Sequence, residues 1–210
     1  MAEIRCPHAN ADSIPGPDIH YVAPRRRDRG VEDSGWIESL LGRAAVGVLA
    51  TVGGEYRPSL NPNLFVYDPD VQRLYLHTAK KGRTRDDLEK NPRVAFTVSE
   101  MGRLLPSDAA VNFSVEYASV ILEGTGHLVE DKAEAERALR LFMAKYAPQF
   151  TYGEDYRGVS DRDLARTSVI EVRIESWSGK HKTSDAEDGY EFSPTRSLEQ
   201  PTAEPRSGHA

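Results

Sequence analysis

The stretch that decides the fold is LYLHTAKKGRTRDDLEKNPRVAFTV, residues 74–98. It predicts a strand over residues 72–78, a basic turn, a short helix from Asp86 to Asn91-Pro92, and a second strand over residues 94–98. The turn gathers three cations, two hydroxyl groups and a glycine. Because the first amides of a helix have no partner within it, they add donors beside these cations. The turn is therefore predicted to bind a phosphate-sized anion.

This stretch resembles the phosphate-binding motif of the pyridoxamine 5'-phosphate oxidase superfamily, in its Nim-type (nitroimidazole-resistance-like) flavin-nucleotide-binding branch. The matching residues are Leu76-His77-Thr78-Ala79, Lys81-Gly82-Arg83, Leu88 and Asn91-Pro92-Arg93-Val94. The resemblance implies that the phosphate of flavin mononucleotide (FMN) is bound here by Thr78, Lys81, Gly82, Arg83 and Thr84. Thr84 departs from the family, which usually has a lysine at this place. One formal charge is lost there, although the hydroxyl can still donate a hydrogen bond and Lys80 or Lys81 can supply the charge.

Composition and charge exclude several classes of protein. The chain has 210 residues, a net charge of −6 and a pI near 5.6, which argue against a general binder of nucleic acid or of anionic membranes. No apolar stretch approaches the ~18 residues of a membrane span, and the N-terminus lacks the apolar core of a secretory signal. We expect a cytoplasmic protein. Its single cysteine, Cys6, is expected to be an incidental free thiol.

The length fits one domain with two tails. Residues 1–30 are rich in Pro, Asp, Arg and Gly and are predicted to be disordered or draped over the surface. The folded domain is expected over residues 31–182, and a disordered tail over residues 183–210. Two amphipathic helices are predicted, one over residues 35–42 with Ser34 as its cap and one over residues 131–146.

The rest of the domain predicts strands. Pro58 and Pro62 cannot donate hydrogen bonds within a sheet, which places their strand at an edge. The elements indicate a β-dominated fold, a six-stranded antiparallel barrel with flanking helices, and the resemblance implies a split barrel. Beyond the two central strands, we predict strands over residues 45–52, 57–67, 111–122 and 167–174. We also predict a loop or short helical insertion over residues 99–108 and a loop over residues 149–164.

The resemblance adds further residues to the cofactor site and implies a homodimer with a flavin at each interface. Asn61, Pro62, Asn63 and Leu64 are expected to border the flavin ring. Lys180 belongs to a terminal Gly-Lys motif near the flavin, and Trp177 either stacks there or plugs the barrel end. Two alternatives also stay open for Tyr117 and Ser119, which either meet the cofactor of the other subunit or are ordinary exposed strand positions.

His77 is the candidate catalytic residue. At the strand end it can bond the phosphate or ribityl chain, or donate a proton to a substrate near the flavin. In Nim-type proteins the matching histidine lies close to the flavin, whereas the alternative is a structural histidine. Tyr152 and Tyr156 are candidates for the border of a substrate cleft.

The expected function is a flavoprotein oxidoreductase that transfers two electrons from NAD(P)H to a small planar acceptor such as a nitroaromatic or a quinone. Without a Rossmann glycine pattern, the nicotinamide is expected to bind transiently. Three alternatives are a non-catalytic flavin-binding or ligand-sensing module, a same-fold protein that uses deazaflavin or haem, and true pyridoxamine phosphate oxidation. The last is disfavoured because Arg103 alone stands out as a candidate for a second phosphate pocket.

Overall fold

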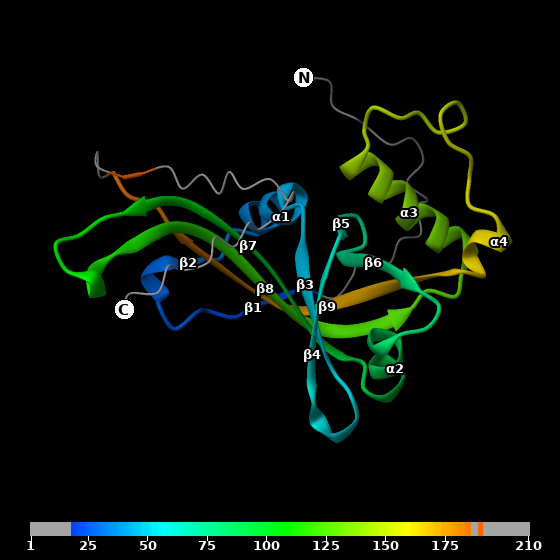
Figure 1. Ribbon diagram of the computed structural model, residues 1–210, viewed down its shortest axis with the longest axis horizontal. Helices are drawn as coiled ribbons and strands as arrows, with labels where there is room; N and C mark the ends of the chain where they lie inside the picture. Colours follow the sequence, from blue (N-terminus) through cyan, green and yellow to red (C-terminus); the bar gives the residue numbers. More distant parts are fainter. Residues whose placement is uncertain (1–17, 186–188, 191–210) are drawn as a thin grey trace, which may run out of the picture.

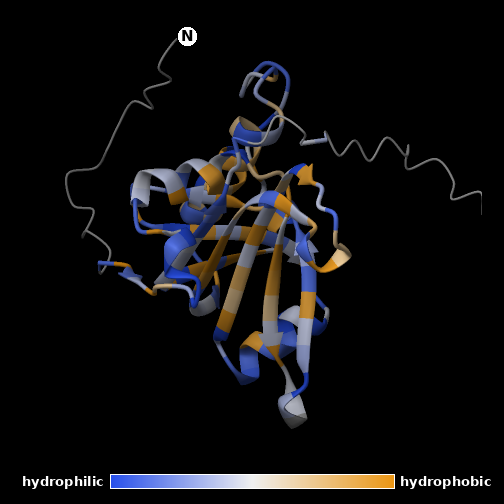
Figure 2. Cartoon of the chain, turned by 90° about the vertical axis from the view of Figure 1, so that its left-hand side faces the viewer, coloured by the Kyte–Doolittle hydropathy of each residue, from blue (hydrophilic) through white to orange (hydrophobic). Residues whose placement is uncertain are grey.

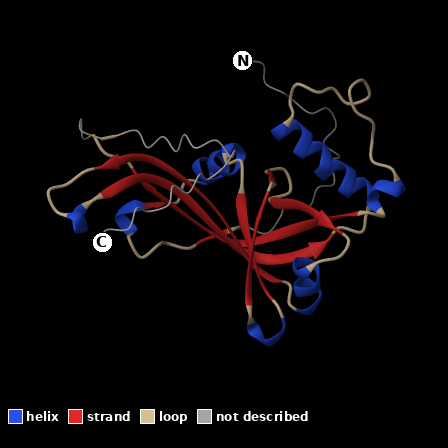
Figure 3. Ribbon diagram, in the orientation of Figure 1, coloured by secondary structure: helices blue, strands red, loops and turns tan. Residues whose placement is uncertain are grey.

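A single twisted sheet runs through the molecule, and helices cover its ends and one side (Figure 1 and Figure 3). The computed structural model describes residues 18–185 and 189–190. Its strands are β1 (His20–Tyr21), β2 (Gly30–Val31), β3 (Gly47–Val52), β4 (Pro58–Asn63), β5 (Val66–Asp68), β6 (Arg73–Ala79), β7 (Arg93–Leu105), β8 (Ser114–Leu128) and β9 (Thr167–Lys182). Its α-helices are α1 (Ser34–Arg43), α2 (Arg83–Lys90), α3 (Lys132–Tyr146) and α4 (Asp161–Leu164), and its 3-10 helices are η1 (Arg27–Arg29), η2 (Gly54–Tyr56) and η3 (Ala110–Asn112).

The strand order is β4-β3-β7-β8-β9-β6-β5, and every pairing along this path is antiparallel. The long strands β7, β8 and β9 form the middle of the sheet, while β4 and β5 form its two edges. The predicted β-dominated antiparallel split barrel with flanking helices is confirmed, although the described residues form nine strands in the sheet rather than the predicted six. The edge position that Pro58 and Pro62 predicted for β4 is confirmed as well.

Several predicted boundaries were wrong, because backbone pairing extends well beyond the local apolar patterns. The stretch predicted as a loop or short helical insertion over residues 99–108 instead continues β7 to Leu105, where it pairs with the start of β8. The last strand runs to Lys182 rather than to residue 174, since β8 and residues 30–31 pair with its second half. The single strand predicted over residues 57–67 is divided into β4 and β5, which lie at opposite edges of the sheet.

The helix starts also differ from the prediction. Asp33, not Ser34, caps α1, because its carboxylate accepts a hydrogen bond from the amide of Gly35 at 2.9 Å. Helix α2 begins at Arg83 rather than at Asp86. Gly82 reverses the chain there with φ 148°, a conformation that favours glycine, so the helix starts at once after it.

The two tails are only partly described. His20–Tyr21 and Gly30–Val31 pair with β9, so residues 18–31 lie against the domain, which is the draped alternative for this part. In the other tail, Tyr190 bridges to Leu104. Cys6 and the rest of both predicted tails lie outside the described residues.

The core fills one side of the sheet. Leu49, Phe96, Leu122 and Trp177 are buried there on four neighbouring strands. At Gly47 a β-carbon would lie 2.0 Å from the Phe96 ring, so only glycine lets β3 approach this ring. Figure 2 shows that the long strands carry much of the hydrophobic sequence, as a sheet with one buried face requires.

Strand β6 separates this core from a second cluster beneath α3. Leu74 and Leu76 point into the main core, whereas Tyr75 is buried against α3. Successive side chains of a strand point to opposite faces. His77 therefore lies on the α3 side, where its ring meets Phe142 edge to face at 4.9 Å, and Thr78 lies on the other side.

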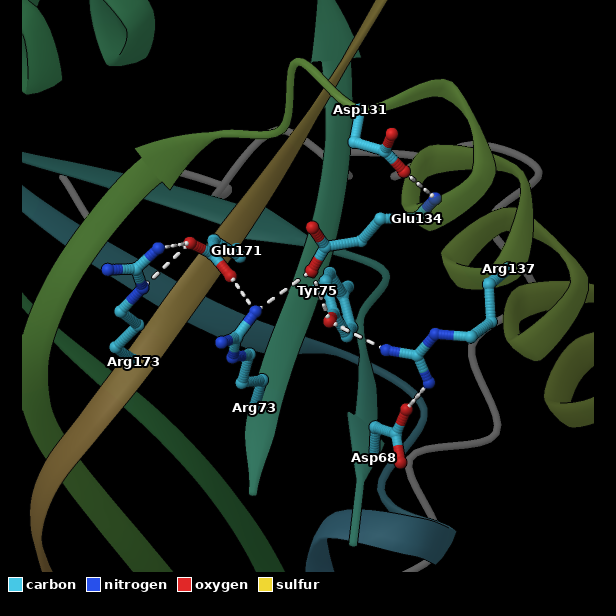
Figure 4. A network of polar contacts seen from close by, with 8 residues as sticks. All are labelled: Asp68, Arg73, Tyr75, Asp131, Glu134, Arg137, Glu171 and Arg173. Carbon is cyan, nitrogen blue, oxygen red and sulfur yellow. Dashed lines mark hydrogen bonds and ion pairs between the residues drawn. The ribbon is translucent and has the colours of Figure 1, made fainter. Parts of the chain in front are cut away.

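A polar network fixes α3 to the sheet (Figure 4). The Tyr75 hydroxyl donates to Glu134 at 2.9 Å and accepts from Arg137 at 2.8 Å. Arg137 also pairs with the buried Asp68, and Arg73 bonds both Glu134 and Glu171. Desolvation raises the pKa of Tyr75 above its ordinary value, so the hydroxyl keeps its proton and its donor role. These contacts specify how α3 packs.

Candidate functional site

Helix α2 is held against the β3-β4 hairpin by a buried hydrogen bond. The hydroxyl of Thr51 donates to the Asp87 carboxylate at 2.8 Å, and both side chains are almost fully buried. At Gly53 a β-carbon would lie 2.2 Å from the same carboxylate, so the hairpin backbone approaches it closely. This contact fixes the orientation of α2 and hence the direction of its first amides.

No side chain caps the N-terminus of α2. The amides of the first helical turn therefore stay available to a ligand. Beside them, the amide nitrogen of Asn61 donates to the hydroxyl of Thr84 at 3.1 Å. The structure thus brings together two residues that the sequence placed in one cofactor site, from β4 and from α2.

Cations surround this helix end. Lys80, Lys81 and Arg83 are exposed, and none of them forms a side-chain hydrogen bond or ion pair with another residue in the described part of the chain. Arg85 differs, because it bonds Glu89 at 3.0 Å and the hydroxyl of Ser168 at 3.1 Å. Three positive charges are therefore open to an anion.

Thr78 lies on the same side as this helix end. It pairs in register with Ser168, the residue that Arg85 contacts, and it is half-buried. Thr78 and Thr84 thus place two hydroxyl groups at the mouth of the barrel, next to the open cations. We name the set of Asn61, Thr78, Lys81, Arg83 and Thr84, with the α2 amides, the α2 site.

The other β4 residues divide between two faces. Asn63 is half-buried and shares its face with Asn61, whereas Pro62 is exposed on the opposite face. Leu64 follows the strand and is also exposed. Of these predicted ring-binding residues, the structure brings only Asn61 into contact with the α2 site.

A second group of predicted residues lies far along the sheet, on its outward face. Ser119 pairs with Lys180 across β8 and β9, and the ammonium of Lys180 lies 5.2 Å from the centre of the Tyr117 ring. Arg29 donates to the Tyr117 hydroxyl at 3.3 Å. Desolvation raises the pKa of Tyr117, but hydrogen bonds and charges from Arg29 and Lys180 together outweigh it, so this pKa is lowered.

Trp177 does not belong to either group. It is 5% exposed and lies in the main core opposite Leu122, on the inner face of the sheet. Of the two alternatives for this residue, the structure shows the packing role.

His77 opens onto a cleft between the end of β6 and residues 155–167. One cavity of about 550 Å³ extends from His77 past Leu139 to Tyr156, and another of about 530 Å³ extends along Thr78 and Ala79 to Arg166. Desolvation lowers the pKa of His77 below its ordinary value, which favours the neutral imidazole at neutral pH. Of the two tyrosines expected at a substrate cleft, Tyr156 lines the larger cavity. The ring of Tyr152 packs against the ring of Tyr156, with 5.6 Å between the ring centres.

The wall of this cleft includes residues that sequence reasoning missed. Asp163 is held by Arg157 at 2.6 Å and by the hydroxyl of Ser160 at 2.7 Å, and a capping box starts α4 there. A serine followed three residues later by an aspartate is a helix-start signal that the sequence carried. The closeness of Arg166 to His77 had no such signal, because it depends on the pairing of β9 with β6.

The comparisons with known proteins agree with this architecture. Residues 33–181 match the family described as pyridoxamine 5'-phosphate oxidase. No curated protein matches the chain. Within the described residues, no helix combines the length and the apolar character that crossing a membrane requires.

Solved structures of similar fold cover most of the chain. A candidate 5-nitroimidazole antibiotic resistance protein from Bacteroides thetaiotaomicron is 26% identical with a TM-score of 0.62, over 72% of this chain and 86% of that one. The flavocytochrome Anf3 from Azotobacter vinelandii is 22% identical with a TM-score of 0.68, over 89% and 91%. The FAD and haem binding protein from Mycobacterium smegmatis is 17% identical with a TM-score of 0.65, over 84% and 93%. Together, the matched residues and the shared sheet architecture show that the chain belongs to the pyridoxamine 5'-phosphate oxidase family.

Proposed function

We propose that the chain is a flavoprotein that binds FMN through the α2 site. The observation that carries this proposal is an uncapped helix N-terminus surrounded by cations that have no acidic partner among the described residues. Backbone amides at such a helix end, with Arg83 and Lys81 beside them, suit a phosphate ester. The hydroxyl groups of Thr78 and Thr84 supply further donors. The residues present therefore fit the phosphate of FMN.

The flavin ring is assigned to the outward face of the sheet, between two copies of the chain. Leu60 on the edge strand β4 is 69% exposed and Ile121 on the central strand β8 is 49% exposed, so two large apolar side chains of this face meet solvent. A second copy would cover these residues and bring its Tyr117 and Lys180 toward the bound ring. Pro62 and Leu64 border the ring in this arrangement, whereas Asn61 and Asn63 lie on the opposite face of β4, where Asn61 serves the phosphate end.

The proposed activity is transfer of two electrons from NAD(P)H to a nitroaromatic or quinone-like acceptor. When bound, FMN supplies the capacity to accept and donate two electrons. The protein residues bind and orient it, and the neutral His77 can donate a hydrogen bond from its imidazole N–H to a substrate in the cleft. The fold similarity to a candidate nitroimidazole resistance protein supports this class of acceptor.

Two observations favour second candidates. Edge-to-face packing of His77 on Phe142 is the environment of a structural histidine, which favours a non-catalytic flavin-binding module.

Neither ring nitrogen of His77 has a hydrogen-bond partner among the described residues, so the imidazole is also free to bind a haem iron. Two proteins of similar fold are described as a flavocytochrome and as an FAD and haem binding protein.

The absorbance spectrum of the purified protein and the mass of its extracted cofactor test the proposal. We expect a yellow protein with a flavin spectrum and the mass of FMN. A colourless protein that takes up no added FMN would contradict it, and the spectrum of haem or the mass of FAD would replace FMN by that group. Oxidation of NAD(P)H with a nitroaromatic acceptor then separates an enzyme from a module that binds flavin without turnover.

A further inference from the structure

The cleft between β6 and residues 155–167 has two chemically different ends. Around His77 its wall is largely apolar and aromatic, with Leu139, Tyr156 and Leu164. At the end of β6 the wall is polar, with Thr78, Thr167 and Arg166. A ligand that fills the cleft would therefore need a flat apolar part and a polar group at one end.

The charged side chains of the cleft also differ between its two ends. Asp163 is already neutralised, because both of its carboxylate oxygens bond Arg157, at 2.6 and 3.1 Å. The bonds from Arg157 and Ser160 lower the pKa of Asp163 well below its ordinary value and outweigh desolvation, which raises it. The charge of Asp155 remains, but Asp155 lines the cavity beside Tyr156 and not the one that Arg166 lines.

Arg166 is the cation of this cleft that has no acidic partner among the described residues. Its guanidinium forms no side-chain hydrogen bond or ion pair with any residue that the structure describes. Lys80 and Lys81 follow directly on Ala79, which lines the same end, so the local potential is positive. A carboxylate at this end would gain a bidentate partner in Arg166 and a hydroxyl donor from Thr167, which pairs with Ala79 on the same face of β6 as His77.

From this polarity we infer that the cleft is the acceptor-binding site and selects planar aromatic monoanions, with the carboxylate at Arg166 and the ring beside His77 and Tyr156. This inference rests on the proposed function, since the bound anion is an electron acceptor only if the protein is a flavin enzyme. The binding itself does not require the flavin. Arg166 is then a specificity-determining residue, because it binds the carboxylate of the ligand and takes no part in the reaction.

Equilibrium binding of 4-nitrobenzoate and of its neutral counterpart 4-nitrobenzamide to the full chain tests this inference. We expect the wild type to bind the benzoate at least fivefold more tightly, as one charge-assisted bidentate contact implies. Arg166→Gln should abolish the preference and Arg166→Lys should restore part of it. Arg162→Gln is the matched control, because Arg162 is exposed on α4, lines neither cavity and should leave the preference unchanged.

A second measurement is independent of any variant. The NMR titration of His77 should show that bound 4-nitrobenzoate raises the pKa of the imidazole, whereas the benzamide leaves it unchanged. Equal affinities for the two compounds, or equal losses in Arg162→Gln and Arg166→Gln, would overturn the inference. A protein that holds flavin but shows no preference loses only this inference, and a flavin-free protein that shows the preference loses only the proposed function.

Discussion

Cations lie on both faces of β6, but their partners differ. Under α3, Arg73 and Arg137 bond carboxylates that are themselves largely buried, and the Tyr75 hydroxyl joins the two groups (Figure 4). At the α2 site, Arg83 and Lys81 are exposed and meet no acidic side chain among the described residues. A cation that is already paired with carboxylates of its own chain has few free donors for a ligand. The comparison therefore assigns packing to the α3 face and anion binding to the α2 site.

The largest effect on stability is expected from removal of an ion pair on the α3 face. Arg137→Ala leaves Asp68, whose side chain is 3% exposed, as a buried charge without its cation, bonded only by the amide of Asp70 among the described residues. We expect a loss of about 3 kcal/mol in the free energy of unfolding. Chemical denaturation measures this loss, while affinity for FMN should stay unchanged in the folded protein.

The control for this variant lies one turn further along α3. Arg140 pairs with Glu136 in an exposed i,i+4 contact, so Arg140→Ala should cost less than about 0.5 kcal/mol. Equal losses from the two variants would mean that burial of Asp68 does not decide the stability of this face.

Lys145 sharpens the comparison, because it is a cation of α3 with carbonyl partners instead of carboxylates. Its ammonium donates to the carbonyls of Leu41 at 3.0 Å and Phe65 at 3.1 Å, and desolvation lowers its pKa to about 8. The unfolded chain keeps this proton up to a higher pH, so the free energy of unfolding should rise as pH increases from about 8 toward the ordinary lysine pKa.

The slope of stability against pH measures this contribution, with Lys145→Met as the comparison. The variant should lose the rise above pH 8 that the wild type shows. If the two proteins had the same slope, Lys145 would titrate normally in the folded state.

The smallest effect is expected at the position where the α2 site departs from its family. Thr84→Lys adds one charge next to Asn61 and should tighten FMN binding by about 0.5 kcal/mol, roughly twofold. Thr84→Val removes the hydroxyl without adding charge and should weaken binding instead. Titration by flavin fluorescence measures both, and weaker binding by the lysine variant would show that the hydroxyl matters more than the charge.

Much of the fold was predictable, because prolines, turns and apolar alternation are local signals. The edge position of β4 followed from Pro58 and Pro62 alone. The extension of β7 to Leu105 was not predictable, since the exposed Met101 and Gly102 carry no strand pattern. Pairing of Met101 and Leu104 with β8, on either side of an irregularity, holds this segment in the sheet. Pairing between distant segments therefore decided the strand lengths.

The α2 site was partly predictable for the same reason. The motif placed the cations and Thr84 together, and the structure added Asn61 through its hydrogen bond. The motif also joined His77 to Thr78, although the alternation of a strand turns these neighbours to opposite faces. A tertiary contact, the packing of α3 on β6, then decided that His77 opens onto a separate cleft.

The most direct test of the α2 site compares FMN with riboflavin, which lacks the phosphate. Fluorescence titration of the flavin-free protein should show at least tenfold tighter binding of FMN, about 1.4 kcal/mol, and Arg83→Glu should remove this preference. Lys90→Glu makes the same charge change at the other end of α2 and should keep it. Equal affinities of the wild type for FMN and riboflavin would contradict the assignment of the phosphate to the N-terminus of α2.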